Sequence, residues 1–205
     1  MNSIKQSLQQ DCNDTISMNQ YMQYKLVVPV DKNVAGSIRQ ERLLFANHYH
    51  HPVLQEEPAI HLAFFEAKEV MEDTIFRWIQ KICSLQQSFF LTLNNYGSIS
   101  SHTIYLQVQD ALPLVQLIGH IKTINGFLQS AGFAPVQASS LPRVEIANGL
   151  TQPYSQKAIA AYLAKSFNAC FPVTTLSLFK RPNNQEAYRL ITKFSLPIQH
   201  YSRVS

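Results

Sequence analysis

The chain has 205 residues, of which 46% are hydrophobic, and a formal net charge of +4 with a pI of about 9.0. This apolar content is enough to bury the core of one large domain or of two fused lobes, which excludes a chain that is disordered throughout. The mildly basic balance permits contact with phosphate groups but does not by itself establish a nucleic-acid partner.

The three cysteines, Cys12, Cys83 and Cys170, have no paired spacing. This pattern argues against a disulfide framework or a zinc cluster and is typical of a reducing compartment. No apolar run has the length of a signal-peptide core or a membrane span. We therefore expect a cytoplasmic protein without a membrane partner, with a flexible polar tail at residues 1–22 and a single bilobed domain at 23–205.

Strands and helices alternate along the first half of the chain. Runs of β-formers predict the strands, and apolar residues at helical spacing predict the helices. The expected elements are a strand at 24–30, a helix from Asp31 or Asn33 that ends before Pro52, a strand at 59–65, a helix over 71–82, and strands at 89–94 and 102–108 joined by a turn at 95–98.

The second half repeats this order without repeating the sequence. Its expected elements are a helix capped by Asp110 and closed by Gly132, a strand at 142–147, a helix from Pro153, a strand at 173–179, and a strand at 187–196 that alternates Tyr188, Leu190, Thr192, Phe194 and Leu196 on one face. The order predicts an α+β fold of two pseudo-symmetric lobes of antiparallel sheet, with helices on the outer faces and a groove between the lobes.

One strand in each half carries the chemistry. Side chains alternate along a strand, so His61 and Ala63 are expected on one face, with Ile60, Leu62 and Phe64 on the other. The apolar back would anchor the strand, and His61 would face the groove.

The corresponding strand of the second half places Arg143 and Glu145 together on one face. Two residues apart on a strand, their Cβ atoms lie about 7 Å apart, within reach of a salt bridge. Such a bridge would partly neutralise Arg143.

These two strands resemble the motifs of the two-histidine phosphoesterase superfamily, which includes the bacterial 2′-5′ RNA ligase-like proteins and cyclic phosphodiesterases. Its signature is His-hydrophobic-Thr/Ser-hydrophobic, occurring twice. His61 keeps the first histidine, but Ala63 stands in place of the first hydroxyl, Arg143 in place of the second histidine and Glu145 in place of the second hydroxyl. The resemblance covers residues 24–196 and implies a metal-independent reaction with no cofactor.

In the family that this chain resembles, the signature histidines transfer protons and the signature hydroxyls stabilise charge on the phosphate. Three of these four side chains are replaced here. Histidine suits both proton roles because its unperturbed pKa is about 6.5. Arg143 can hold a phosphate but cannot shuttle protons, because its pKa is too high. One positioned acid or base is worth about 10²–10⁴ in rate, and a charge-stabilising donor about 10²–10³. The losses therefore predict a pseudoenzyme.

Three hypotheses follow from these residues. The first is a degenerate phosphoesterase-like module in which His61, Arg143 and Glu145 retain nucleotide binding or RNA binding at a phosphate end. The second is an active phosphodiesterase or ligase, with His61 as the catalytic proton-transfer residue and Arg143 stabilising the transition state. The third is a protein-interaction domain with a filled groove, for which the sequence names no partner.

Other chemistry-bearing residues are given structural roles. The histidine run His48, His50 and His51 lacks a cysteine or spaced carboxylate, so no metal site is expected. Lys180 and Arg181, at the end of a late strand, could contact the phosphate of a ligand, but a solvated turn is the favoured interpretation. The side chains His102, Tyr96 and Tyr105 could present aromatic surface to a base, but such residues are more often half-buried neighbours in a sheet.

Overall fold

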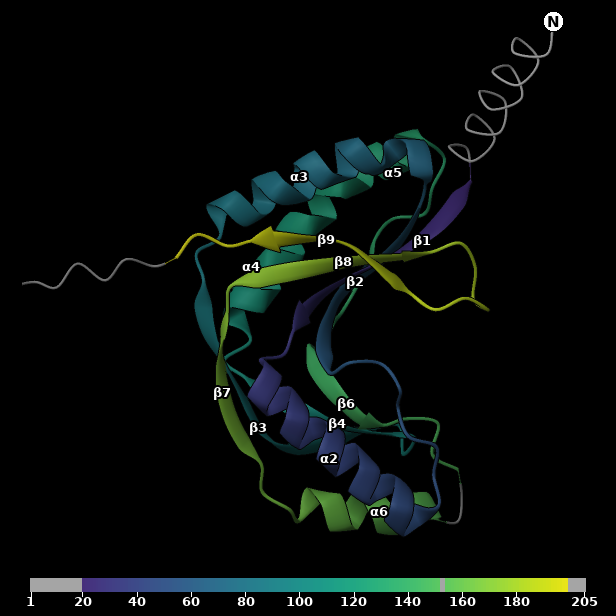
Figure 1. The fold of residues 1–205 in the computed structure, drawn as a ribbon, viewed down its shortest axis with the longest axis vertical. Coiled ribbons are helices and arrows are strands. Elements are labelled where there is room, and N and C mark those ends of the chain that lie inside the picture. Colours follow the sequence, from purple (N-terminus) through teal and green to yellow (C-terminus); the bar gives the residue numbers. More distant parts are fainter. Residues whose placement is uncertain (1–19, 152–153, 199–205) are drawn as a thin grey trace, which may run out of the picture.

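The computed structural model describes residues 20–151 and 154–198, which form two antiparallel sheets (Figure 1). Sheet A has the strand order β5-β2-β1-β8-β9, and sheet B has the order β6-β4-β3-β7. The strands of sheet A are β5 (Gln137–Ala138), β2 (Ala59–Lys68), β1 (Tyr21–Pro29), β8 (Thr175–Arg181) and β9 (Arg189–Ser195). Those of sheet B are β6 (Arg143–Ala147), β4 (Thr103–Gln109), β3 (Phe89–Ile99) and β7 (Asn168–Val173).

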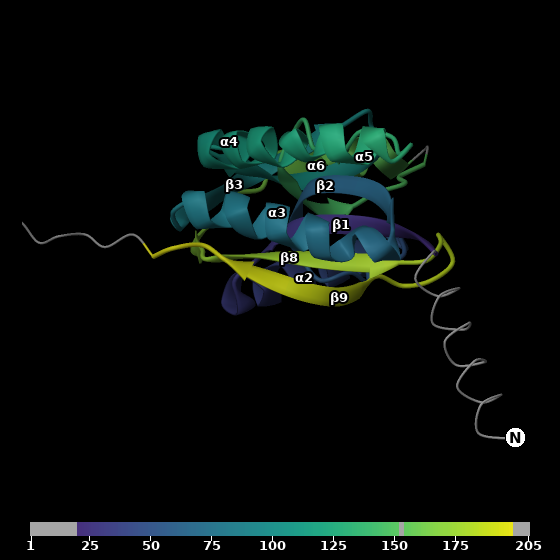
Figure 2. The same cartoon turned by 90° about the horizontal axis from the view of Figure 1, so that it is seen from above.

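Among the described residues, two helices pack on each sheet. In each case one of the two follows a strand of the other sheet in the sequence. Sheet A contacts α3 (Glu72–Leu85) and α4 (Leu112–Ile121), and sheet B contacts α2 (Lys32–Tyr49) and α6 (Tyr154–Leu163). Seen from above in Figure 2, α3 runs along β8 and β9, whereas α4 lies farther back over β2. Short helical segments complete the chain: η1 (Glu69–Met71), η2 (Lys122–Ile124) and α5 (Asn125–Ser130).

The architecture confirms the predicted α+β fold with two antiparallel sheets and helices on their outer faces. The element order makes each sheet bury one apolar face under its helices. Ile60 and Leu62 on β2 and Val144 and Ile146 on β6 are fully buried on these faces. Strands β2 and β6 also contact one another, which brings the two motif strands together at the boundary between the sheets.

The hairpin between β3 and β4 differs from its prediction. Residues 95–98 do not turn, because β3 continues to Ile99 and the chain reverses at Ser100 and Ser101, both with positive φ. The register instead shifts between Leu93 and Tyr96, and Asn95 has a φ of 59°. Asparagine tolerates this left-handed conformation, so the turn-like residues produce a β-bulge within the strand.

The C-terminal strands also differ from their prediction. The run 173–179 is divided between β7, which joins sheet B, and β8, which joins sheet A. In β9, Leu190 pairs with Phe179 and Thr192 pairs with Leu178, so Ile191 is an extra residue. The predicted alternation is therefore wrong across this bulge: the side chains before it face the opposite side from those after it.

The long helix predicted from Asp110 is interrupted. It consists of α4, η2 and α5, and its first cap is Ala111, whereas Asp110 has a φ of 54° and does not cap. Gly132 does close it, with a φ of 83° and an amide that donates to Gln129 O at 3.0 Å. Glycine adopts this conformation without a Cβ penalty, as predicted.

The predicted tail lies mostly outside the described residues. Its last two residues, Tyr21 and Met22, already belong to β1. Pro153, the predicted start of the third helix, also lies outside them, and the described part of α6 begins at Tyr154. No helix among residues 20–151 and 154–198 is both long and apolar enough to cross a membrane.

A buried ion-pair network joins the back of sheet A to the segment leading into α3. The ammonium of Lys180, whose side chain is 7% exposed, donates to Glu69 and to Glu72 Oε1. The hydroxyl of Tyr24 donates to the same Glu72 oxygen at 2.9 Å. Lys180 therefore belongs to the framework and does not lie in the predicted solvated turn.

We expect Lys180→Ala to lower the free energy of unfolding by about 3 kcal/mol, because it leaves two carboxylates without their buried cation. Denaturant unfolding monitored by circular dichroism measures this change. Arg39→Ala serves as the control, because the Arg39–Glu57 pair is exposed on both sides and its loss should cost less than about 1 kcal/mol. Equal losses for the two variants would contradict the structural role of Lys180.

Candidate functional site

His61 lies in β2 at a β-bulge. On β1 the consecutive residues Leu26 and Val27 pair with Ala63 and His61, so Leu62 is an extra residue in β2. The bulge shifts the alternation by one, and Leu62 and Ala63 are both buried. The prediction that Ala63 shares the face of His61 is therefore wrong.

Phe64 takes the place beside His61 that the sequence pattern assigned to Ala63. The two rings lie with centroids 5.3 Å apart at an interplanar angle of 84°, and both line the same cavity. An edge-to-face contact of this kind restricts the orientation of the imidazole ring. The uninterrupted apolar run Leu62–Phe65 was the sequence signal for the bulge, because it breaks the polar-apolar alternation.

Arg143 and Glu145 lie on one face of β6, as predicted. Arg143 Nη2 and Glu145 Oε1 are 2.9 Å apart, which confirms that the two side chains pair. The other carboxylate oxygen accepts a hydrogen bond from Asn148 Nδ2 at 3.1 Å. Both oxygens of Glu145 are thus held by donors of its own strand and the loop that follows.

The other two nitrogens of the Arg143 guanidinium make few hydrogen bonds. Its Nη1 donates to Leu141 O at 3.3 Å, and its buried Nε has no hydrogen-bond partner among the described residues. The guanidinium lies over the Tyr105 ring, 5.7 Å from the centroid. Tyr105 in turn lies against Gly97, where an added Cβ would come within 2.6 Å of the ring. Gly97 therefore sets the position of the ring beneath Arg143.

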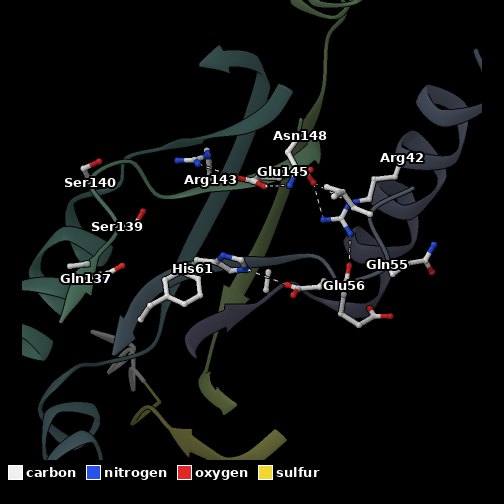
Figure 3. A pocket seen from close by; sticks show the side chains of 15 residues that line it. Arg42, Gln55, Glu56, His61, Gln137, Ser139, Ser140, Arg143, Glu145 and Asn148 are labelled. Atoms are coloured by element: carbon white, nitrogen blue, oxygen red, sulfur yellow. Dashed lines mark hydrogen bonds and ion pairs between the residues drawn. The ribbon is translucent and has the colours of Figure 1, made fainter. Parts of the chain in front are cut away.

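Figure 3 shows His61 on one wall of a cavity and Arg143 with Glu145 on the facing wall. The cavity, which we call the groove, has a volume of about 640 Å³. Much of its remaining lining is polar: Gln55, Glu56, Gln137, Ser139, Ser140 and Asn148. The fold therefore brings all three sequence-predicted site residues together around one open space.

Glu56, in the loop before β2, was missed by the sequence analysis. Its Oε2 lies 2.7 Å from Lys25 Nζ and 3.9 Å from His61 Nε2. Partial burial would raise the pKa of Glu56, but the hydrogen bond and charge of Lys25 outweigh it and hold that pKa below its usual value. Glu56 therefore brings a fixed negative charge to the rim of the groove.

His61 is neutral at neutral pH. Burial lowers the pKa of its imidazole below 6.5, and the nearby Lys25 ammonium lowers it further, while Glu56 and Glu145 act in the opposite direction. The 3.9 Å contact with Glu56 becomes an ion pair only when the imidazole is protonated. The neutral ring can accept a proton, which is the requirement for a general base.

Arg42, on α2, is a further residue that the sequence analysis missed. Its Nε and Nη2 donate to the backbone oxygen of Glu145 at 3.0 and 2.8 Å, and its Nη1 donates to the backbone oxygen of Glu56. It is only 5% exposed. An arginine within the apolar stripe of Ile38 and Phe45 was the available sequence signal.

The remaining candidates lie outside the groove. His102 Nδ1 bonds Leu150 O at 2.7 Å, and His51 Nε2 bonds Asn148 O at 2.8 Å. These contacts hold the loop after β6. Within the described ranges, no three histidine, cysteine, aspartate or glutamate side chains form a group that could hold a metal ion. Arg181 lies on the front of sheet A beside Tyr188, with its guanidinium 4.3 Å from the ring centroid.

Several solved structures are similar in fold. E. coli LigT in complex with 3′-AMP matches with a TM-score of 0.62 at 17% identity, covering 86% of this chain and 99% of LigT. TT0787 of Thermus thermophilus matches with a TM-score of 0.65 at 13% identity, covering 87% and 100% of the two chains. LigT in complex with ATP matches with a TM-score of 0.56 at 18% identity, covering 87% and 99%.

The chain has a LigT-like fold. This likeness confirms the α+β fold that the sequence resemblance implied. Identities of 13%, 17% and 18% establish the architecture alone. No family model matches the sequence, and no curated protein does so. The function of this chain therefore has to be inferred from the residues in its groove.

We expect the His61 imidazole to titrate below pH 6.5, because burial and Lys25 disfavour its charged form. In Glu56→Gln the pKa should fall further, because the carboxylate that favours protonation is gone, and in Lys25→Met it should rise. Proton-detected NMR of the histidine ring measures all three values. A pKa at or above 6.5 in the native chain, or a rise in Glu56→Gln, would contradict this electrostatic account.

Proposed function

We propose that the groove binds the phosphate-bearing end of a nucleotide or RNA, and that the ordinary two-histidine reaction of the fold is lost. The observation that carries this proposal is the placement of His61 opposite the Arg143–Glu145 pair across one open groove. The scaffold of a phosphoesterase is intact, but its second motif contains a salt bridge. The protein is then a pseudoenzyme that retains a ligand site.

The loss of the ordinary reaction follows from the groups at the three replaced positions. Metal-free chemistry at a 2′-oxygen needs one group to remove a proton and another to return it. His61 can do one of these, and Arg143 can do neither. Ala63 is buried behind the bulge and offers no donor to the groove, while Glu145 brings a negative charge near the phosphate.

Binding is supported by the donors that remain. Arg143 has one long hydrogen bond at Nη1, to Leu141 O, so this end of its guanidinium keeps capacity for a phosphate oxygen. The neutral His61 ring can donate one hydrogen bond. The similar LigT structures hold 3′-AMP and ATP, which makes nucleotides the first ligands to test. Because Arg143 is already paired, the expected affinity is modest.

The active-enzyme hypothesis is favoured by the position of His61 on the open groove, where burial lowers the pKa of its imidazole. A neutral imidazole in an open groove suits a general base, and Arg143 could stabilise charge on the phosphate. The filled-groove hypothesis has less support. It requires apolar side chains that fill the space between His61 and Arg143, whereas that space is open.

We expect no His61-dependent turnover of a 2′,3′-cyclic nucleotide or of RNA with a 2′-5′ linkage, because Arg143 cannot transfer the second proton. Product formation by the purified chain is compared with that by His61→Ala. Robust turnover that is abolished in both His61→Ala and Arg143→Ala, with unchanged melting temperatures, would establish the active-enzyme hypothesis instead.

We expect Glu145→Gln to bind 3′-AMP about fivefold more tightly, or by about 1 kcal/mol, because Arg143 is freed and a repelling charge removed. Calorimetry at low salt measures the dissociation constants. Glu57→Gln is the matched control: Glu57 also lines the groove but is 77% exposed and pairs with Arg39, so its change should be smaller. Weaker binding by Glu145→Gln would assign Glu145 a direct contact with the ligand.

A further inference from the structure

A second cavity opens from the groove past His61. Its volume is about 400 Å³, which lies within the range of about 300–1,000 Å³ that small-molecule sites occupy. Five residues line both cavities: Gln55, Glu56, Glu57, Ala59 and His61. We call the second cavity the chamber. A single ligand could therefore occupy both cavities, extending from Arg143 past His61 into the chamber.

The chamber has a chemical character different from that of the groove. Much of its own lining is apolar: Val27, Pro29, Pro58, Phe179 and Ala187. These residues come from β1, the loop before β2, β8 and the segment before β9, on the front of sheet A. An apolar recess beside a charged groove favours a ligand with an apolar, flat part joined to an anionic part.

Two aromatic rings lie in the chamber, and they differ in how much of their surface is already engaged. Lys25 Nζ lies 4.2 Å and Arg181 Cζ 4.3 Å from the Tyr188 ring centroid, so two cations contact this ring. The Phe179 ring is half-buried and has only Lys25 over it among the described residues, at 5.8 Å. Phe179 is therefore the ring that offers a surface for stacking.

The bulge in β9 makes this arrangement possible. It lets Leu190 pair with Phe179 on the front of the sheet, whereas Phe194 packs against Phe76 on the α3 side. Without Ile191 as the extra residue, the uninterrupted alternation would carry Tyr188 to the α3 side. The bulge thus leaves Tyr188 on the chamber side of sheet A.

We propose that the chamber binds the nucleobase of a nucleotide whose phosphate lies in the groove beside Arg143. This assignment rests on the proposed function. It adds a contact with the base, the part of the ligand by which one nucleotide can be discriminated from another. A base has a flat face for Phe179 and polar edges for Gln55, whose amide donates only a long 3.4 Å bond to Val53 O. The distance between base and phosphate is spanned by the sugar, which then lies beside His61.

The experiment compares three probes on the full chain: 3′-AMP, adenosine and inorganic phosphate. Phe179→Ala removes the stacking surface and should weaken 3′-AMP by at least about tenfold, while the affinity for inorganic phosphate stays unchanged. Phe76→Ala is the matched control, because Phe76 is a half-buried phenylalanine on α3 outside both cavities. It should leave the affinity for all three probes unchanged.

Saturation-transfer NMR on the unaltered chain supplies a test that needs no variant. The adenine protons of 3′-AMP should receive more saturation than its ribose protons, because the base is the enclosed part. If 3′-AMP binds equally to Phe179→Ala and the native chain, or its ribose protons are the more strongly saturated, the chamber is not a base site, while phosphate binding in the groove still stands. If neither 3′-AMP nor phosphate binds, the proposed function fails, and the chamber assignment fails with it.

Discussion

The guanidinium of Arg42 donates to the backbone oxygens of Glu145 and Glu56, which belong to opposite sides of the groove. Burying this charge costs free energy unless it is fully hydrogen-bonded, and here its bonds go to main-chain carbonyls. The interaction therefore fixes the backbone positions of both acidic residues and leaves their carboxylates available for other partners.

Once those backbones are fixed, the charges of the groove pair with one another. Glu145 accepts from Arg143 and Asn148, and Glu56 accepts from Lys25. A groove with balanced internal charges does not attract a phosphate strongly, because each new contact competes with an existing one.

The sequence predicted the parts that depend on local pattern. Alternation placed Arg143 and Glu145 on one face, and the spacing of apolar residues located the α3 stripe with Ile75 and Ile79 buried. What it missed depends on a single extra residue in a strand. Leu62 and Ile191 each shift the alternation by one. The apolar run Leu62–Phe65 signals a break in the alternation of β2, but it does not say which residue is the extra one, because the bulge is set by pairing with a neighbouring strand.

Residues that act through long-range contacts were also beyond prediction. Arg42 lies 103 positions from Glu145, and Lys25 lies 31 from Glu56, so only the folded topology shows that they meet. An arginine within an apolar helical stripe is a signal that a buried acceptor exists, but it does not say which one. The two α+β halves could be read from element order, whereas the exchange of α2 and α4 between the sheets could not.

Lys25 connects the chemistry of the groove with the shape of the chamber. It pairs with Glu56, lowers the pKa of His61, and lies over both Tyr188 and Phe179. A ligand that enters the chamber would remove water from this ammonium and strengthen its field at the imidazole, since electrostatic interactions grow as the local dielectric falls. Occupation of the chamber would then favour neutral His61, so base and phosphate would not be recognised independently. Lys25 thus acts on both cavities through Glu56 and His61, which line the groove as well as the chamber.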